Sequence, residues 1–203
     1  MDFCHISVAV IHGSVTELEE FIGQHSSGAG IDSLFRDLGV QAIVSGGQSL
    51  NPSTAELLEA VERVNADHVI VLPGNKNIIA VAEQLDALTT KTVRVVPTRS
   101  MPAGLAALMA HDPEVDAPAN ASPMLRAADA VATGEITQAV RATSTTAGPV
   151  AVGDWLAIAG RDGIVGVAPS AVEAAQQLLE QLVVDDAELI TLLVGADAAE
   201  DER

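Results

Sequence analysis

The sequence predicts an α/β fold, with a mainly parallel sheet flanked by helices in a first lobe, residues 1–119, and a smaller α+β lobe, residues 120–203. The main observation is a pattern that occurs three times in the first lobe. A short apolar run ends in turn residues and is followed by an amphipathic helix. The runs are Val40–Val44, His68–Leu72 and Val93–Val96. This succession is typical of βαβ units with right-handed crossovers, so we expect three parallel strands in one sheet.

The composition agrees with this fold class. Hydrophobic residues make up 48% of the chain and aromatic residues only 2%, so the core must consist of Ala, Val, Ile and Leu side chains. Such a core suits helices packed on a buried parallel sheet, whose strands are short apolar runs.

The other elements of the first lobe follow from periodicity. Before the first run, we expect a strand at Ile6–Ile11, a helix at Val15–Ile22 and a second helix at Ile31–Leu38. After the three runs, apolar residues at helical spacing predict helices that contain Leu57–Val64, Ile78–Leu88 and Leu105–Met109, and Ser53 or Thr54 is the expected N-cap of the first of these.

The pattern changes after a segment rich in Asp, Pro and Ala, His111–Pro123, which we interpret as a loop at the lobe boundary. Beyond it we expect a helix, two long strands, a hairpin at Gly160–Gly163 with a strong Asp-Gly turn signal, a further helix and a last strand. The first helix is expected at Met124–Ala132 and the two long strands at Glu135–Thr143 and Val150–Ile158. The hairpin turn leads into a strand at Ile164–Val167, the further helix is expected at Val172–Leu182 and the last strand at Leu189–Val194.

Charge and cysteine content narrow the function classes. Ten basic residues against 28 acidic residues give a formal net charge of −18, which disfavours nucleic acid and anionic lipid as partners. No apolar stretch reaches the roughly 20 residues that span a bilayer. The single cysteine, Cys4, cannot form an internal disulfide, and the N-terminus does not resemble a signal peptide. We therefore expect a cytoplasmic protein.

Polar residues follow the first two predicted strands, at the sheet edge where open α/β proteins bind ligands. Two glycines allow close backbone approach, and neutral side chains beside a helix N-terminus could hold a carboxylate or phosphate. The candidate ligand-binding residues, which we call the predicted crevice, are Gly46, Gly47, Gln48, Ser49, Asn51, Ser53, Thr54, Asn75, Lys76 and Asn77, with Pro97–Ser100 as a far wall. The alternative is structural: the glycines form a turn, Asn51, Ser53 and Thr54 cap the helix, and Lys76 is a solvent-exposed lysine. The residues alone do not decide between the two.

Catalytic and metal motifs are not supported. The segment around Ser49 has Asn51 where a nucleophile elbow requires glycine, and no phosphate-binding P-loop or dinucleotide fingerprint is present. The histidines lack companion ligands at metal-binding spacing. We therefore expect no catalytic residue, no metal and no cofactor in this domain.

Several stretches resemble the C-terminal domain of the A-type subunit of bacterial fatty acid kinase, a family whose members are often described as dihydroxyacetone kinase-like. The most specific is the run from Ser45 to Thr54, Ser-Gly-Gly-Gln-Ser-Leu-Asn-Pro-Ser-Thr. The other matching stretches are Val64–Pro73, Asn75–Ile79, Val93–Thr98, Gly104–Leu108, Gly134–Arg141, Gly153–Asp154 and Glu188–Thr191, and the resemblance covers roughly residues 29–197.

The resemblance implies the two-lobed fold shared by the fatty acid-binding B-type subunit family and the substrate domain of dihydroxyacetone kinase. It also implies that a separate helical domain of the parent chain binds ATP and magnesium, and that a B-type partner protein carries the fatty acid. The implied product is an acyl phosphate used in phospholipid synthesis. Members of this family typically continue beyond the strand at Glu188–Val194, so the resemblance implies that the second lobe is either truncated at its C-terminal end or divergent there. The helical domain is absent from this sequence, so we expect a non-catalytic domain that docks the fatty acid-binding partner and acts within a transferase, a kinase.

Two alternatives remain at this point. The chain could be a module that binds a small anionic ligand in the predicted crevice, or the substrate domain of a dihydroxyacetone-type kinase. The second requires a histidine placed to bond a ketone, whereas His68 begins a predicted strand instead of ending one. The sequence also leaves a homodimer open.

Overall fold

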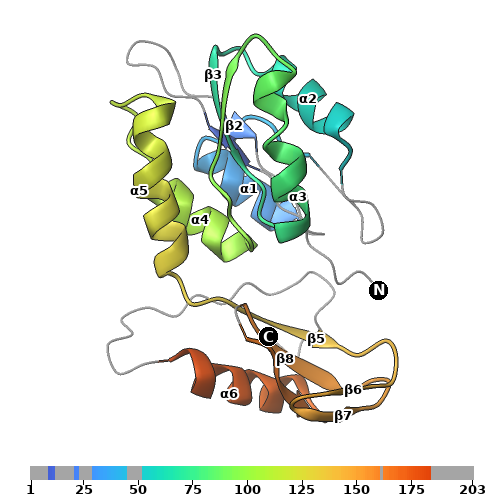
Figure 1. Cartoon of the computed structure of the whole chain (residues 1–203). Helices are drawn as coiled ribbons and strands as arrows, with labels where there is room; N and C mark the ends of the chain where they lie inside the picture. Colours follow the sequence, from blue (N-terminus) through green and yellow to red (C-terminus); the bar gives the residue numbers. More distant parts are fainter. Residues whose placement is uncertain (1–8, 12–20, 23–28, 45–51, 161, 184–203) are drawn as a thin grey trace. The chain divides into compact units, whose positions relative to one another are not determined.

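The computed structural model describes residues 9–11, 21–22, 29–44, 52–160 and 162–183, with side chains from residue 33 onward. The chain divides into two compact units, Met1–Val131 (unit 1) and Ala132–Arg203 (unit 2). Each combines helices with a small sheet (Figure 1). The predicted strand at Leu189–Val194 lies outside the described residues.

The sheet of unit 1 contains four strands in the order β2-β1-β3-β4. Their bounds are Ala9–Ile11 for β1, Phe21–Ile22 for β2, His68–Leu72 for β3 and Thr92–Val95 for β4. β3 and β4 are parallel, as expected for consecutive βαβ strands, whereas β1 is antiparallel to both β2 and β3. The prediction of a mainly parallel sheet is therefore not confirmed. Residues Phe21–Ile22, expected in a helix, instead pair with β1.

The first apolar run, residues 40–44, forms no strand. The two edges of β3 are occupied by β1 and β4, so this run does not pair with β3. Its side chains are nevertheless placed in the core: Val44 and Ala42 pack in one apolar cluster, Val40 and Ile43 in another. Burial was thus predicted correctly and strand pairing was not, because an apolar run specifies burial but does not specify its neighbour.

Helices cover both faces of β3, whose residues alternate between two clusters (Figure 1). Val69 and Val71 pack against α2, Thr54–Arg63, against α3, Lys76–Ala82, and against a short 3₁₀ turn η1, Leu85–Ala87. Ile70 and Leu72 pack with residues of α1, α4 and α5. The bounds of these three helices are Ala29–Asp37, Met101–Met109 and Ala117–Ala130.

Helix α5 begins inside the segment expected to be a loop. Asp116 caps its N-terminus, since the Ala119 N–H donates to Asp116 Oδ1 at 2.9 Å, and Pro118 lies in the first turn, where proline is tolerated. The buried Asn120 side chain donates to the Asp112 and Val115 carbonyls and accepts from the Asp112 N–H. The helix therefore spans the expected boundary near residue 120 and belongs to unit 1.

Unit 2 has a three-stranded antiparallel sheet, β5-β8-β9, and a separate two-stranded ribbon, β6-β7. The expected hairpin is present, since β8, Trp155–Ala159, pairs with β9, Gly163–Ala168. The two long strands expected before it are each divided. The first gives β5, Gly134–Gln138, and β6, Thr143–Thr145; the second gives β7, Gly148–Val150, and β8. Helix α6, Ala171–Leu182, packs on the sheet through Ala174 and Leu178.

Candidate functional site

The turns that follow β3 and β4 are joined at the end of the parallel pair. The Val96 N–H donates to the Val71 carbonyl at 2.9 Å, which extends the ladder beyond β4. Gly74, in the turn between β3 and α3, has a φ of 60°, which lies in the left-handed region that favours glycine. The Gly74 N–H donates to the Thr98 hydroxyl at 2.9 Å, and Thr98 is only 1% exposed. The two post-strand turns are thus fixed to each other by a buried side chain.

Two helices begin directly after these turns, and each has its own cap. Asn75 Oδ1 accepts the Asn77 N–H at 2.8 Å at the start of α3. Ser100 Oγ accepts the Ala103 N–H at 3.3 Å at the start of α4. Lys76 and Asn77 are exposed, and Asn75 is half-buried. The structure therefore gives Asn75 a capping role and places the side chains of Lys76 and Asn77 in solvent.

The remaining described residues of the predicted crevice lie at the start of α2, where Ser53 forms a capping box with Glu56. The Glu56 N–H donates to Ser53 Oγ at 3.2 Å, and the Ser53 N–H donates to Glu56 Oε2 at 2.7 Å. Hydrogen bonds from the backbone and side chain of Ser53 lower the pKa of the Glu56 carboxyl. This helix start therefore already holds a carboxylate. Thr54 is half-buried as the first residue of α2.

The other crevice residues, Gly46, Gly47, Gln48, Ser49 and Asn51, lie outside the described residues. Within the part of the chain that the structure describes, no hydrogen bond connects the start of α2 with the loop before α3. The convergence of all ten residues on one crevice stays a prediction.

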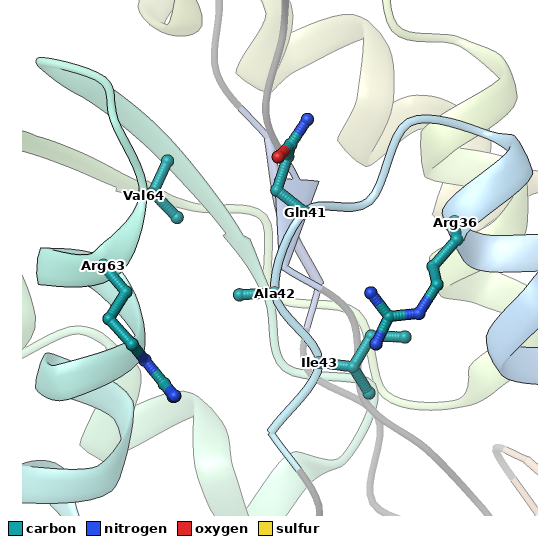
Figure 2. A pocket seen from close by; sticks show the side chains of 6 residues that line it. All are labelled: Arg36, Gln41, Ala42, Ile43, Arg63 and Val64. Carbon is teal, nitrogen blue, oxygen red and sulfur yellow. The ribbon is translucent and has the colours of Figure 1, made fainter.

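A cleft in unit 1 lies between the ends of α1 and α2 (Figure 2). Its volume is about 240 Å³, and it is lined by Arg36, Gln41, Ala42, Ile43, Arg63 and Val64. We call it the Arg36–Arg63 cleft. Helix α1 is followed by Gly39, whose φ is 94°, and the Val40 N–H donates back to the Phe35 carbonyl at 2.9 Å. This turn directs residues 41–43 through the cleft, with Arg36 on one side and Arg63 on the other (Figure 2).

Sequence reasoning missed both arginines and considered Thr98 only as part of a crevice wall. An arginine in the last turn of a helix is favourable for the helix dipole, so Arg36 and Arg63 each have an ordinary local explanation. Only the tertiary structure brings the two helix ends together. For Thr98, the available signal was a hydroxyl two residues after the apolar run Val93–Val96, most of which lies in β4.

Neither a metal centre nor a membrane-spanning helix is found in the described part of the chain. Within these residues, no three His, Cys, Asp or Glu side chains are grouped so that they could hold a metal ion. No described helix has both the length and the apolar character needed to cross a bilayer.

Comparison with known proteins identifies the family. The sequence model for the FakA-like family, described as the C-terminal part of proteins like the A-type fatty acid kinase subunit, matches residues 24–203. Protein YloV of Bacillus subtilis is 38% identical over 175 residues, which cover 86% of this chain and 32% of YloV. Uncharacterized proteins of Staphylococcus epidermidis (SERP0792) and Staphylococcus saprophyticus (SSP1546) are 36% and 34% identical over 173 residues. Each of those matches covers 85% of this chain and 31% of the relative.

The chain spans about a third of the length of these relatives. The matched residues include parts of both units, from α1 through the hairpin of unit 2 to α6. The match exceeds half of the chain by a wide margin, and the chain therefore belongs to the FakA-like C-terminal domain family of fatty acid kinase.

Proposed function

We propose that the chain is the partner-docking domain of a fatty acid kinase-type protein. In this proposal it binds a fatty acid-binding protein of the B type while the parent protein forms an acyl phosphate. The family match over residues 24–203 carries the proposal. Phosphoryl transfer depends on positioned metal ions and charged groups around the phosphates. We assign that chemistry, with ATP and magnesium, to a helical domain of the parent protein, and we assign binding to the domain described here.

Two exposed apolar side chains in unit 2 support a docking role. Val140 is 67% exposed and Val152 is 68% exposed. The segments that carry them are held together by two backbone hydrogen bonds: the Ala139 N–H donates to the Asp154 carbonyl at 2.7 Å, and the Gly153 N–H donates to the Ala139 carbonyl at 2.8 Å. These bonds fix Val140 and Val152 at one end of the sheet. Exposed apolar side chains on a backbone that is already ordered suit an interface, because little conformational entropy is lost when they are covered.

The test is a calorimetric titration of the fatty acid-loaded B-type protein into this chain. We expect saturable binding, and we expect the double substitution Val140→Asp, Val152→Asp to weaken it by about tenfold or more, the loss typical of central interface residues. Leu88→Asp is the matched control, because Leu88 is 51% exposed and lies in unit 1. No binding by the wild-type chain would contradict the docking proposal. Equal affinity of the double variant would exclude these valines as the anchors.

A second measurement tests the assignment of chemistry to another domain. The isolated chain, with ATP, magnesium and the loaded partner, should not phosphorylate fatty acid or dihydroxyacetone. Turnover that disappears on substitution of a residue in this chain would show that the domain itself is catalytic.

A further inference from the structure

The Arg36–Arg63 cleft combines two guanidinium groups without a counter-charge from the described part of the chain. Its described lining residues include no Asp or Glu, and no ion pair joins either arginine to a described carboxylate. By contrast, Arg94 lies 3.5 Å from the carboxylate of Asp86. In a chain with a net charge of −18, acidic partners for an arginine are plentiful. Two guanidiniums on one cleft that lack such a partner among the described residues are therefore a local reversal of the surface charge.

Lys91 adds a further positive charge beside the cleft, at the C-terminal end of α2. The Lys91 ammonium donates to the Val61 carbonyl at 2.8 Å, to the Glu62 carbonyl at 3.2 Å and also to the Val64 carbonyl. These are the terminal carbonyls of the helix, where the partial negative charge of the helix dipole is concentrated. Because Lys91 satisfies them, the helix end that forms one wall of the cleft does not oppose an anion.

The size of the cleft and the arrangement of its arginines select among anions. A volume of about 240 Å³ is below the roughly 300–1,000 Å³ of pockets that enclose a drug-sized ligand, so the cleft suits a head group and not a whole acyl chain. Arg36 and Arg63 come from different helices and flank the segment 41–43 on opposite sides (Figure 2). A carboxylate presents its two oxygens in one plane. A phosphate presents oxygens in several directions, so it suits two guanidiniums that approach from different sides better than a carboxylate does.

We propose that the Arg36–Arg63 cleft is a phosphate-binding site, in which both guanidiniums donate to the phosphate oxygens. None of its described lining residues belongs to the predicted crevice, and the proposal is independent of the docking proposal. Ala42, Ile43 and Val64 supply apolar surface beside the arginines, so the phosphate can be inorganic phosphate or the head group of a phosphate monoester with an apolar substituent. Both arginines are exposed, which limits the strength of each ion pair and leads us to expect weak, salt-sensitive binding.

The experiment uses the full chain alone and three probes: inorganic phosphate, butyl phosphate and butyrate. Binding is followed by NMR chemical shifts of the arginine Nε–H groups and the backbone amides of residues 41–43. We expect saturation by both phosphates and at least about tenfold weaker binding of butyrate. Tighter binding of butyl phosphate than of inorganic phosphate would identify the monoester as the ligand class, and the reverse order would identify free phosphate.

Arg36→Gln and Arg63→Gln should each weaken phosphate binding by about tenfold, the loss of one charge-assisted pair. Arg126→Gln is the control, because Arg126 is exposed on α5 and does not line the cleft. Thermal unfolding of all three variants checks that the fold is retained. Equal losses in all three variants would reduce the observation to nonspecific charge attraction and overturn the proposal, as would saturation by butyrate with the same affinity as phosphate. Failure of partner docking would leave these titrations unaffected.

Discussion

Unit 1 and unit 2 are filled by different kinds of side chain. The largest fully buried side chains of the described residues, among them Phe35, Ile70 and Met124, all belong to unit 1. Among the described residues of unit 2, the buried cluster between α6 and the sheet consists of Ala157, Ala159, Ala168, Ala174 and one larger residue, Leu178, with partly buried Ile136, Trp155, Val165 and Leu182 packed against it. In unit 2 the helix can therefore approach the sheet closely. The difference indicates opposite sensitivities: unit 1 should tolerate loss of volume poorly, and unit 2 should tolerate added volume poorly.

The largest expected effect is the loss of a core side chain in unit 1. Ile70 lies in the central strand β3 and is 0% exposed, so Ile70→Ala should lower the free energy of unfolding by about 2–5 kcal/mol. Urea unfolding followed by circular dichroism measures this loss. The only tryptophan, Trp155, lies in unit 2 and reports that unit by fluorescence. A loss smaller than that of Leu178→Ala, measured in the same way, would contradict the comparison.

The same substitution, glycine to alanine, should have opposite signs in the two units. A Cβ at Gly134 would lie 2.7 Å from Leu178 Cδ1 and 2.9 Å from Leu182 Cδ1, so Gly134→Ala should destabilise unit 2 by about 1–3 kcal/mol. A Cβ at Gly104, in helix α4, would meet nothing within 4 Å. Gly104→Ala should stabilise unit 1 by about 0.5–1 kcal/mol, because alanine favours the helix. If both substitutions change the free energy of unfolding in the same direction, measured by urea unfolding, packing around glycine does not distinguish the units.

A smaller effect concerns two helix caps of similar sequence, one in each unit. Ser53 and Ser170 both precede a Glu by three residues, but only Ser53 forms the complete capping box with its Glu. Ser53→Ala and Ser170→Ala should each cost about 1 kcal/mol. Glu56→Gln should be more damaging than Glu173→Gln, because Glu56 also accepts the Ser53 N–H. Indistinguishable unfolding midpoints for the two Gln variants would remove the distinction.

The smallest effect is a pH dependence that is confined to unit 1. Burial lowers the pKa of His111, although the nearby Asp112 acts in the opposite direction. As the pH falls below the ordinary value of 6.5, the unfolded chain binds a proton before the native His111 does. The stability of unit 1 should therefore decrease with falling pH until the native pKa is passed.

This pH dependence is checked by urea midpoints between about pH 7.5 and 5.5, a range that brackets the ordinary pKa of histidine. Unit 2 contains no histidine, so its Trp155 transition is an internal control. The slope for unit 1 should be shallower in His111→Gln. A slope that is unchanged in this variant would assign the dependence to other groups.

Local patterns predicted the hairpin and most of the described helices because their signals are contained within a few residues; the exceptions are Phe21–Ile22, which form a strand, and the early start of α5 at Ala117. Ser53 caps α2 as expected, and an Asp-Gly pair lies in the turn between β8 and β9. Strand pairing was predicted less well. Nothing within residues 40–44 indicates that β1 occupies the strand edge beside β3. The division of the long strands of unit 2 depends on backbone bonds between distant residues, such as Gly153 to Ala139.

The candidate site shows the same division between local and distant information. Asn75 was recognised as a polar residue at a strand end, and its capping bond is local. The Arg36–Arg63 cleft depends on two helix ends that are separated in sequence and brought together by the core. No periodicity within either helix could indicate that the two arginines share a cleft.

The bond between Gly74 and Thr98 has a consequence for hydrogen exchange. Gly74 lies in a turn outside every strand and helix, where amide protons ordinarily exchange with solvent quickly. Its N–H is bonded to a buried hydroxyl from the turn after β4, so exchange requires that the two turns separate. The Gly74 amide should therefore remain protonated for a time set by the opening of this sheet edge. In a Thr98→Val chain it should become deuterated much sooner.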